Sequence, residues 1–307
     1  MGDDIGLWSV PLAVLGGAIR VSTPFLFVSL GECLTERSGR INLGLEGTLV
    51  FGAMSGYAVA YHTGSPWSGV LAAMVAGSAF GLMHGWICKL PIVNDIAIGI
   101  AMMLFGIVLA FFFGKPYIQP VAPDLPALNF GGWSDLPQVQ AALKINILFL
   151  LGIVIAVGMW WMFRNTRMGL IIRVVGDSTD AARAMGLNPN KVRLLSTAAG
   201  GALAGVGGAY LSLYYHGSWN EGISSGLGLM AVALGIFARW NPILCFWSAL
   251  LFGGAGALGP ALQSVGISQG YYLFYAAPYV LTLVMMILTS SSTKSMTGAP
   301  GELSITK

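Results

Sequence analysis

The chain has 307 residues and a formal net charge of +3, but only 9% of its residues are charged and 56% are hydrophobic. An average soluble protein carries roughly 25% charged residues, so this composition excludes an ordinary soluble domain and predicts an integral membrane protein. Backbone groups in lipid must be satisfied within their own segment, and the apolar blocks are continuous rather than alternating. We therefore expect an all-α membrane protein, a polytopic helical bundle.

In chain order, the apolar blocks predict about nine transmembrane helices, within a range of about eight to ten. The blocks cover residues 11–31, 42–62, 67–88, 93–113, 145–163, 192–214, 226–238, 243–263 and 270–290. The seventh block is short and the second carries Glu46, so either could be a half-helix or a re-entrant piece. The acidic N-terminal segment lacks the basic start of a signal peptide, so we expect the first block to remain in the mature protein.

These blocks predict a single transmembrane domain over residues 1–290. Between the fourth and fifth blocks, residues 114–144 are rich in Pro and aromatic residues, and we expect them to lie along the external membrane face. Residues 291–307 are small and polar, which predicts a disordered cytoplasmic tail.

Lys and Arg are concentrated in alternate loops, which predicts the orientation of the chain through the positive-inside rule. If the loop 164–193 is cytoplasmic, the N-terminus is external, the C-terminus is cytoplasmic, and only Lys115 and Lys144 fall in external loops. The basic residues then assigned to the cytoplasmic side are Arg37, Arg40, Lys89, Arg164, Arg167, Arg173, Arg183, Lys191, Arg193, Arg239, Lys294 and Lys307.

A weak internal similarity links two pairs of blocks. GLEGTLVFGAM with SPWSGVLAAMVAGSAFG is similar to GLGLMAVALGIFARWNPILCFWSALLFGGAG. Each copy runs a glycine-opened apolar piece into a Pro turn and then a helix rich in small residues. The predicted topology places the two copies in opposite directions, as in the inverted repeats of many transporters.

The loop RNTRMGLIIRVVGDSTDAARAMGLNPNKVR, residues 164–193, predicts a short helix between two spans. Gly176 breaks the preceding segment, Asp177 or Ser178 can cap a new helix, and the Ala-rich STDAARAM favours about two turns. Gly186 can end that helix, and Asn188 with Pro189 can start the next one. The helix could lie on the inner leaflet, but it offers Ala in place of bulky membrane anchors, which favours docking into a protein groove.

This loop, together with TERSGRINLGLEG and GSWNEGISSGLGLMAVALGIFARWNP, resembles the permease subunits of bacterial ABC importers. The nearest group is the nucleoside and simple-sugar permeases, within the superfamily of branched-chain amino acid and ribose permeases. The resemblance covers nearly the whole chain, and its three motifs occur in the order and at the spacing of that family. It departs at LGLMAVALGI, where a GFIALAAVIFG-like run is expected, and this leaves the ligand open.

The resemblance implies that the chain is the transmembrane permease subunit of an ATP-binding-cassette importer for a small polar solute, and it also implies the partners. The segment GDSTDAARAMGL corresponds to the coupling helix that sits in a groove of the cytoplasmic ATPase. Its residues implied in coupling are Gly176, Asp177, Asp180, Ala181, Ala182, Arg183 and Gly186. A second, related permease subunit, an extracytoplasmic substrate-binding lipoprotein and the lipid of a bacterial inner membrane are the other expected partners, and a nucleoside is the expected solute.

The sequence lacks the P-loop that an ATP site requires, because its Gly114-Lys115 pair is followed by Pro116 in an external loop. We therefore expect the chain to be no enzyme and to bind no cofactor, with ATP and Mg²⁺ held by the partner ATPase. His62, His84 and His216 show no metal-ligand spacing, and nothing in the sequence indicates nucleic-acid binding.

Polar residues near membrane depth are candidates for the translocation path, because burying them is costly. These candidates are Asn42, Glu46, Asn94 and Asp95. Glu46 could instead brace a broken helix, pairing with Arg37 or Arg40, and Asn94 and Asp95 could cap the fourth block. A secondary transporter driven by an ion gradient would need a carboxylate such as Glu46 at mid-membrane, so it is the alternative function. An ABC permease for a simple sugar or a nucleobase is the other.

Overall fold

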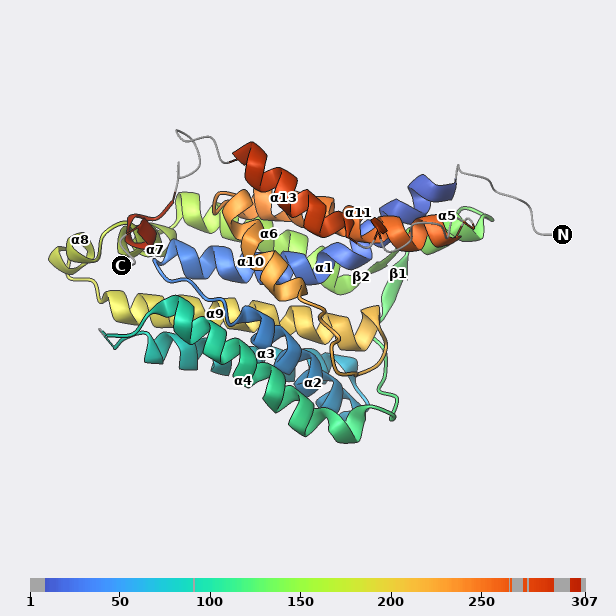
Figure 1. Ribbon diagram of the computed structural model, residues 1–307, viewed down its shortest axis with the longest axis horizontal. Helices are drawn as coiled ribbons and strands as arrows, with labels where there is room; N and C mark the ends of the chain where they lie inside the picture. Colours follow the sequence, from blue (N-terminus) through green and yellow to red (C-terminus); the bar gives the residue numbers. More distant parts are fainter. Residues whose placement is uncertain are drawn as a thin grey trace.

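The computed structural model describes residues 9–90, 92–264, 266, 273–274, 276–289 and 299–304. The predicted tail positions Lys294 and Lys307, the acidic N-terminal segment and the first residues of the block 270–290 lie outside these ranges. The described chain is mostly helical, as the composition predicts, with one two-stranded sheet (Figure 1).

The helices that form the body of the molecule (Figure 1) follow the order of the apolar blocks along the chain. They are α1 (Ser9–Arg37), α2 (Leu45–Thr63), α3 (Pro66–Ile87), α4 (Asp95–Gly114), α6 (Ile147–Asn165), α9 (Pro189–Tyr210), α10 (Leu227–Phe237), α11 (Pro242–Ser264) and α13 (Ala277–Thr289). Shorter elements join them: η1 (Lys115–Tyr117), β1 (Ala127–Asn129), α5 (Pro137–Ala142), β2 (Lys144–Asn146), α7 (Arg167–Asp177), α8 (Thr179–Ala184), η2 (Leu211–Tyr215) and η3 (Gly301–Ser304).

Six helices in the described ranges are long and apolar enough to cross a membrane: α1, α3, α4 continued through η1, α6, α9 continued through η2, and α11. The remaining blocks form α2, the 11-residue α10 and the 13-residue described part of α13. The expected number of about nine spans is therefore not confirmed. At about 1.5 Å per residue, α10 measures roughly 16 Å, close to half of a bilayer core, in line with the expected half-helix.

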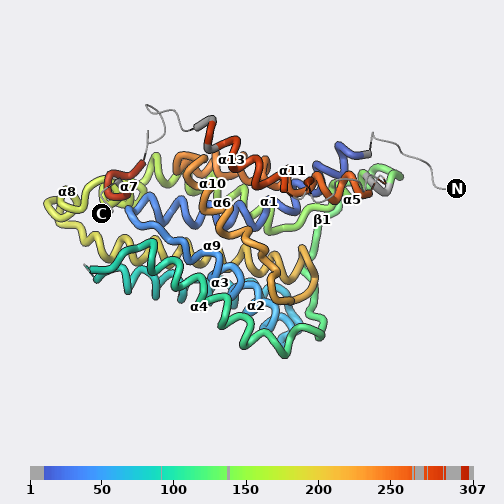
Figure 2. Tube along the Cα trace, viewed as in Figure 1, coloured from blue at the N-terminus to red at the C-terminus, as the bar shows by residue number. Residues whose placement is uncertain are grey.

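Helices α1 and α9 lie in the middle of the bundle (Figure 2). Helix α9 packs against α1, α2 and α3, while α11 packs along α1 on the other side. Glycines permit this close packing, because a Cβ added at Gly77 of α3 would collide with the carbonyl oxygen of Gly201 in α9. A Cβ added at Gly31 of α1 would likewise lie 3.3 Å from Gly200 Cα. Small residues thus bring the backbones of these helices into contact.

Two ends of the bundle differ in structure (Figure 1). One end carries α7, α8 and η3, and we call it the α8 end. The opposite end carries α5 and the antiparallel pair β1–β2, in which Leu128 lies opposite Ile145. The block 114–144 thus holds short elements that an all-helical prediction did not contain.

Helices α2 and α10 both begin inside the bundle. The segment 38–44 runs inward from the α8 end before α2 starts, and Gly47 of α2 packs against Met103 of α4. Met103 is eight residues into α4, which places Gly47 roughly 12 Å from the start of that helix. The first turn of α10 meets the first turn of α2, because a Cβ on Gly228 would lie 2.7 Å from Glu46 Cα. From this meeting point, α2 runs towards the opposite end and α10 runs towards the α8 end (Figure 2).

Candidate functional site

The loop at the α8 end is built from successive capped helices. Thr166 accepts a hydrogen bond from the amide of Gly169 to start α7, Ser178 accepts from Ala181 N at 3.2 Å to start α8, and Asn188 accepts from Lys191 N to start α9. Of the two cap residues expected for α8, the structure uses Ser178. Gly186 has a φ of +75° and follows α8, as a left-handed C-cap requires.

Gly176 does not break the helix that precedes α8. Helix α7 continues through Gly176 to Asp177, and the missing side chain serves a close approach instead. A Cβ at this position would collide with the carbonyl oxygen of Arg37 and lie 3.3 Å from Gly39 N. The glycine at position 176 is thus structurally important, but because it lets α7 pack on the turn after α1 and not because it ends a helix.

Not all alanine side chains of α8 are exposed. Asp180, Ala181 and Arg183 are exposed, together with Met185 after the helix, but Ala182 is fully buried. Ala182 therefore cannot offer its side chain to a partner, and the expectation that it lies on the docking face needs correction. A six-residue helix can turn only part of its circumference outward, and the face with Ala182 packs inward.

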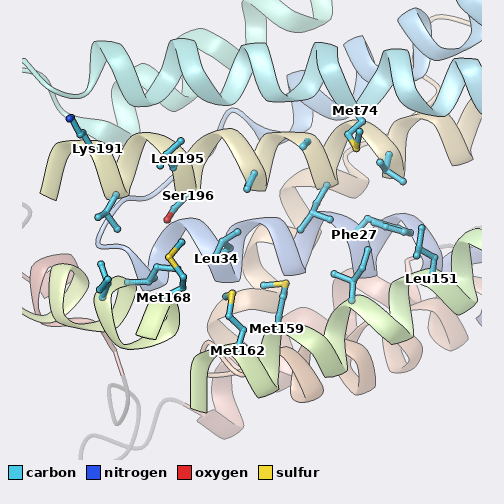
Figure 3. A pocket seen from close by; sticks show the side chains of 18 of the residues that line it. Phe27, Leu34, Met74, Leu151, Met159, Met162, Met168, Lys191, Leu195 and Ser196 are labelled. Carbon is cyan, nitrogen blue, oxygen red and sulfur yellow. The ribbon is translucent and has the colours of Figure 1, made fainter. Parts of the chain in front are cut away.

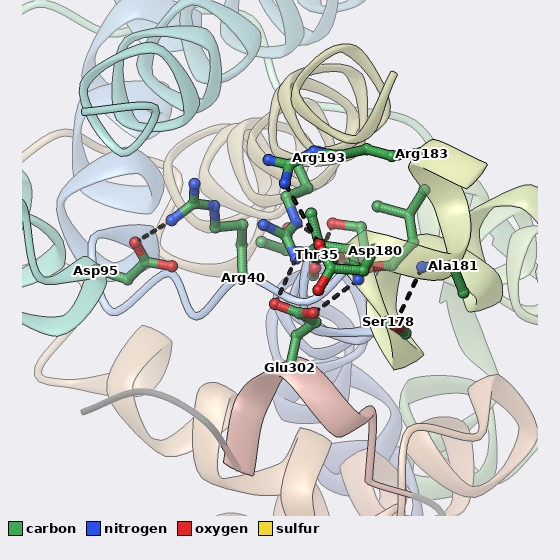
Figure 4. A network of polar contacts seen from close by, with 12 residues as sticks. Thr35, Arg40, Asp95, Ser178, Asp180, Ala181, Arg183, Arg193 and Glu302 are labelled. Atoms are coloured by element: carbon green, nitrogen blue, oxygen red, sulfur yellow. Dashed lines mark hydrogen bonds and ion pairs between the residues drawn. The ribbon is translucent and has the colours of Figure 1, made fainter. Parts of the chain in front are cut away.

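A polar network holds α8 against the rest of the molecule (Figure 4). Glu302 of η3 accepts a hydrogen bond from Thr179 N at 2.7 Å and forms a 3.2 Å ion pair with Arg193. Burial alone would raise the pKa of Glu302, but the bonds from Thr179 and the guanidinium of Arg193 outweigh it and lower that pKa. Residues 299–304 of the expected disordered tail thus contact the start of α8 and Arg193 of α9.

The segment 38–44 is fixed on several sides. Arg193 Nε donates to the carbonyl of Ser38 at 3.1 Å, and His84 Nε2 lies 3.1 Å from the carbonyl oxygen of Ile41. Arg40 forms an ion pair with Asp95 (Figure 4). Arg37 Nε donates to the carbonyl of Trp240, so neither Arg37 nor Arg40 pairs with Glu46, contrary to that expectation.

The candidates for the translocation path fall into separate places. Asn94 caps α4 by accepting from the amides of Ile96 and Ala97, while Asp95 neutralises Arg40. Asn42 accepts from Gly44 N at 3.0 Å and lies at the inner end of the segment 38–44. Each of these side chains therefore has a local structural partner. Their role in transport stays a prediction.

Glu46 caps the first turn of α10 from the first turn of α2. Its Oε1 accepts from Ser224 Oγ at 2.6 Å and from Gly226 N at 3.2 Å. Its Oε2 accepts from Gly228 N at 2.5 Å and from Leu229 N at 3.2 Å. The side chain is buried, and the amides at a helix N-terminus stabilise a negative charge. Sequence reasoning missed these partners, although the glycines of GISSGLG are a signal that could have pointed to a close approach.

A large groove runs between α3 and α9 on one side and α6 and α7 on the other (Figure 3). Its volume is about 1020 Å³, and its lining includes Phe27, Met74, Leu151, Met159 and Leu195. The figure shows mostly carbon and thioether side chains, with Lys191 at one end. Because it offers a polar solute almost no hydrogen-bond partners, this groove is not the site where such a solute would be recognised.

Comparisons with known proteins match almost the whole chain. A family model described as the permease component of branched-chain amino acid transport systems matches residues 14–290. A putative glucose ABC transporter permease of Haloferax volcanii is 32% identical over 85% of this chain and 80% of its own length. A nucleoside ABC transporter permease of Lactococcus lactis is 28% identical over 90% and 91%. A guanosine ABC transporter permease of Bacillus subtilis is 28% identical over 86% and 88%.

Proposed function

The chain belongs to the permease family of branched-chain amino acid transport systems, and from this premise we propose that it is the membrane-spanning subunit of an ATP-driven nucleoside importer. The observation that carries the proposal is the pairing of two features. A capped, exposed helix lies at one end of the bundle, and the first turns of α2 and α10 meet inside it. The exposed helix α8 offers a docking site for an ATPase whose conformational change would drive transport. The junction of α2 and α10 inside the bundle is the kind of discontinuous helix that lines substrate paths in transporters.

We place the α8 end in the cytoplasm of a bacterial cell. The chain direction through the bundle brings Arg37, Lys89, Arg164 and Arg239 to this end, whereas Lys115 and Lys144 lie at the opposite end. This distribution obeys the positive-inside rule for an inner-membrane protein. The N-terminus then faces outward, where a substrate-binding lipoprotein would deliver the solute.

The ATPase docks on the exposed side of α8 in this proposal. The sequence holds no P-loop, so ATP and Mg²⁺ would bind to the partner. Closure of two ATPases would move two such loops, one from this chain and one from a second permease subunit. The movement would reach α7 and α9 directly, since α8 lies between them with only short connections.

Co-purification with the ATPase tests the docking surface. Ala181→Trp adds bulk on the exposed face of α8, so we expect the ATPase to be lost while the permease keeps its yield and its melting temperature. Ala141→Trp is the matched control, because Ala141 is exposed near the opposite end. Normal retention of the ATPase by Ala181→Trp would contradict docking on this face.

The choice of nucleoside rests on relatives that match this chain along most of its length and are themselves described as nucleoside and guanosine permeases. The match to a putative glucose permease keeps a simple sugar as the alternative. The two classes differ chemically in the nucleobase, which a site can bind by stacking and by hydrogen bonds to its edge. A sugar offers only hydroxyl groups.

Uptake into proteoliposomes with the complete importer tests both the class and the solute. We expect radiolabelled guanosine to accumulate only when ATP is enclosed on the ATPase side, and unlabelled glucose not to compete. Accumulation driven by a proton gradient without ATP would contradict the ABC mechanism. Competition by glucose but not by other nucleosides would replace the proposed solute with a sugar.

A further inference from the structure

Two glutamates that the transport proposal does not use lie one helical turn apart near the end of α1. Glu32 is fully buried and Glu36 is 3% exposed. Residues four apart on a helix face the same way, so both carboxyl groups point to the same neighbour, α10. A Cβ added at Gly235 of α10 would lie 3.7 Å from Glu36 Oε2 and 3.9 Å from Glu32 Cγ. The pair therefore lies directly under this glycine.

Within the described part of the chain, hydrogen-bond donors outside the pair reach one oxygen of each carboxyl group. Asn42 N donates to Glu32 Oε1 at 2.9 Å, and the indole N–H of Trp240 donates to Glu36 Oε2. The two carboxyl groups also lie close enough to each other for their charges to interact. Glu32 Oε2 is buried and receives no hydrogen bond from any other group in the described part of the chain.

This geometry has a simple chemical requirement. Two ionised carboxylates are both acceptors, so a hydrogen bond between them needs a proton on one. Neither Glu32 nor Glu36 forms an ion pair with a cation in the described residues. Two like charges buried side by side would repel strongly, and one group binds a proton instead.

The other titratable groups near the pair do not replace this proton. On α1, Arg37 Nε donates to the carbonyl of Trp240 at 3.0 Å and its guanidinium lies over the ring of Phe163. On α1 and α11, Cys33 and Cys245 are buried free thiols. Helix α10 carries no titratable side chain, and the segment 38–44 presents the backbone amide of Asn42.

We propose that Glu32 and Glu36 form a binding site for a single proton, carried on Glu32 Oε2 and donated to Glu36. The bound proton completes a chain of hydrogen bonds from Asn42 through Glu32 and Glu36 to Trp240. This chain joins the inner end of the segment 38–44 to Trp240, three residues after the end of α10. Release of the proton leaves two like charges on α1 buried under α10, which favours opening of this contact to water, so the contact between α1 and α10 depends on pH.

The substitution Glu32→Gln copies the protonated state. Its amide oxygen can accept from Asn42 N, and its NH₂ group can donate to Glu36 as the bound proton does. Glu221→Gln is the matched control, because Glu221 is exposed and distant in sequence from the pair.

Infrared spectroscopy of the purified full-length permease tests the proton directly. We expect wild type at neutral pH to show the C=O stretch of a buried protonated carboxyl, with a shift in deuterated buffer. Glu32→Gln should remove this band and Glu221→Gln should leave it unchanged. Absence of the band in wild type, or its persistence in Glu32→Gln, would overturn the proposal. Should Glu32→Gln not fold, Glu36→Gln must shift the frequency of the band, and an unshifted band would overturn the proposal.

The pH dependence of thermal stability is a second readout. Unfolded Glu loses its proton above a pH of about 4.3, so a proton held only in the folded state makes stability fall as pH rises. We expect the melting temperature of wild type to decrease as pH rises above about 4.3, and Glu32→Gln to reduce that decrease. Identical slopes for both proteins would overturn the proposal. The result does not depend on the transported solute, so it stands or falls separately from nucleoside import.

Discussion

Replacement of Glu46 by Gln tests whether this carboxylate supports the junction of α2 and α10. Each carboxylate oxygen of Glu46 accepts two hydrogen bonds. Gln keeps one oxygen, but its NH₂ group must face two donors that it cannot accept from. The loss of two bonds to a charged group, each contributing about 1.5–3 kcal/mol, predicts a decrease of at least about 3 kcal/mol in the free energy of unfolding.

The assay is thermal unfolding of the detergent-purified permease. For a chain of this size, 1 kcal/mol corresponds to roughly 2 °C, so we expect Glu46→Gln to lower the melting temperature by about 6 °C. Ser224→Ala, which removes a single 2.6 Å bond, should lower it by about half as much. The control Glu221→Gln alters an exposed carboxylate and should leave the melting temperature unchanged.

The transport assay separates the two roles of Glu46. If Glu46 only supports the junction of α2 and α10, Glu46→Gln should change uptake per folded molecule less than it changes the yield and the melting temperature. If Glu46→Gln retained wild-type stability and yield but lost uptake, the capping argument would be refuted and a role in the solute path would replace it.

Three further predictions follow from the contacts. Gly201→Val should lower stability by about 1–3 kcal/mol because a side chain there meets the backbone of α3, whereas Gly158→Ala, in open space, should be neutral or stabilising; equal melting temperatures would contradict close packing. Replacing Arg40 and Asp95 singly and together should give a coupling energy of about 1–3 kcal/mol in a double-mutant cycle, and additive effects would show an uncoupled pair. Glu302→Gln should increase hydrogen exchange in α8 by removing at most about 1 kcal/mol, because Glu302 is partly exposed. Since its pKa is lowered in the folded chain, this contribution should be present at neutral pH and vanish as pH falls below about 4, and a difference from wild type that persists at lower pH would count against it.

The positions of most apolar helices could be predicted from the sequence, because membrane spans depend on local hydropathy and length. The caps at Ser178, Asn188 and Asn94 could also be located, since a cap bonds to amides two or three residues away. The Ala-rich helix before Gly186 was found for the same reason. These features are local, so tertiary contacts are not needed to recognise them.

Long-range partners could not be predicted in the same way. Glu46 bonds to groups about 180 residues away, and Arg40 pairs with Asp95 rather than with Glu46. The docking of Glu302 on α8 was missed because the tail is small and polar, with no apolar signal for an ordered segment. Two carboxyls at Glu32 and Glu36 are visible in the sequence, but only burial under α10 turns them into a pair that needs a proton.

The amino-acid sequence by itself determined that this is a helical membrane protein, which family it resembles and where its exposed, Ala-rich helix α8 begins and ends. These properties follow from hydrophobicity, capping and helix propensity, which act over a few residues. The tertiary structure alone decided that Ala182 faces inward, that Gly176 serves packing and that Glu46 caps a distant helix. Such outcomes depend on which backbone comes close to which, and in a bundle rich in glycine that choice is made by contacts between segments far apart in the chain.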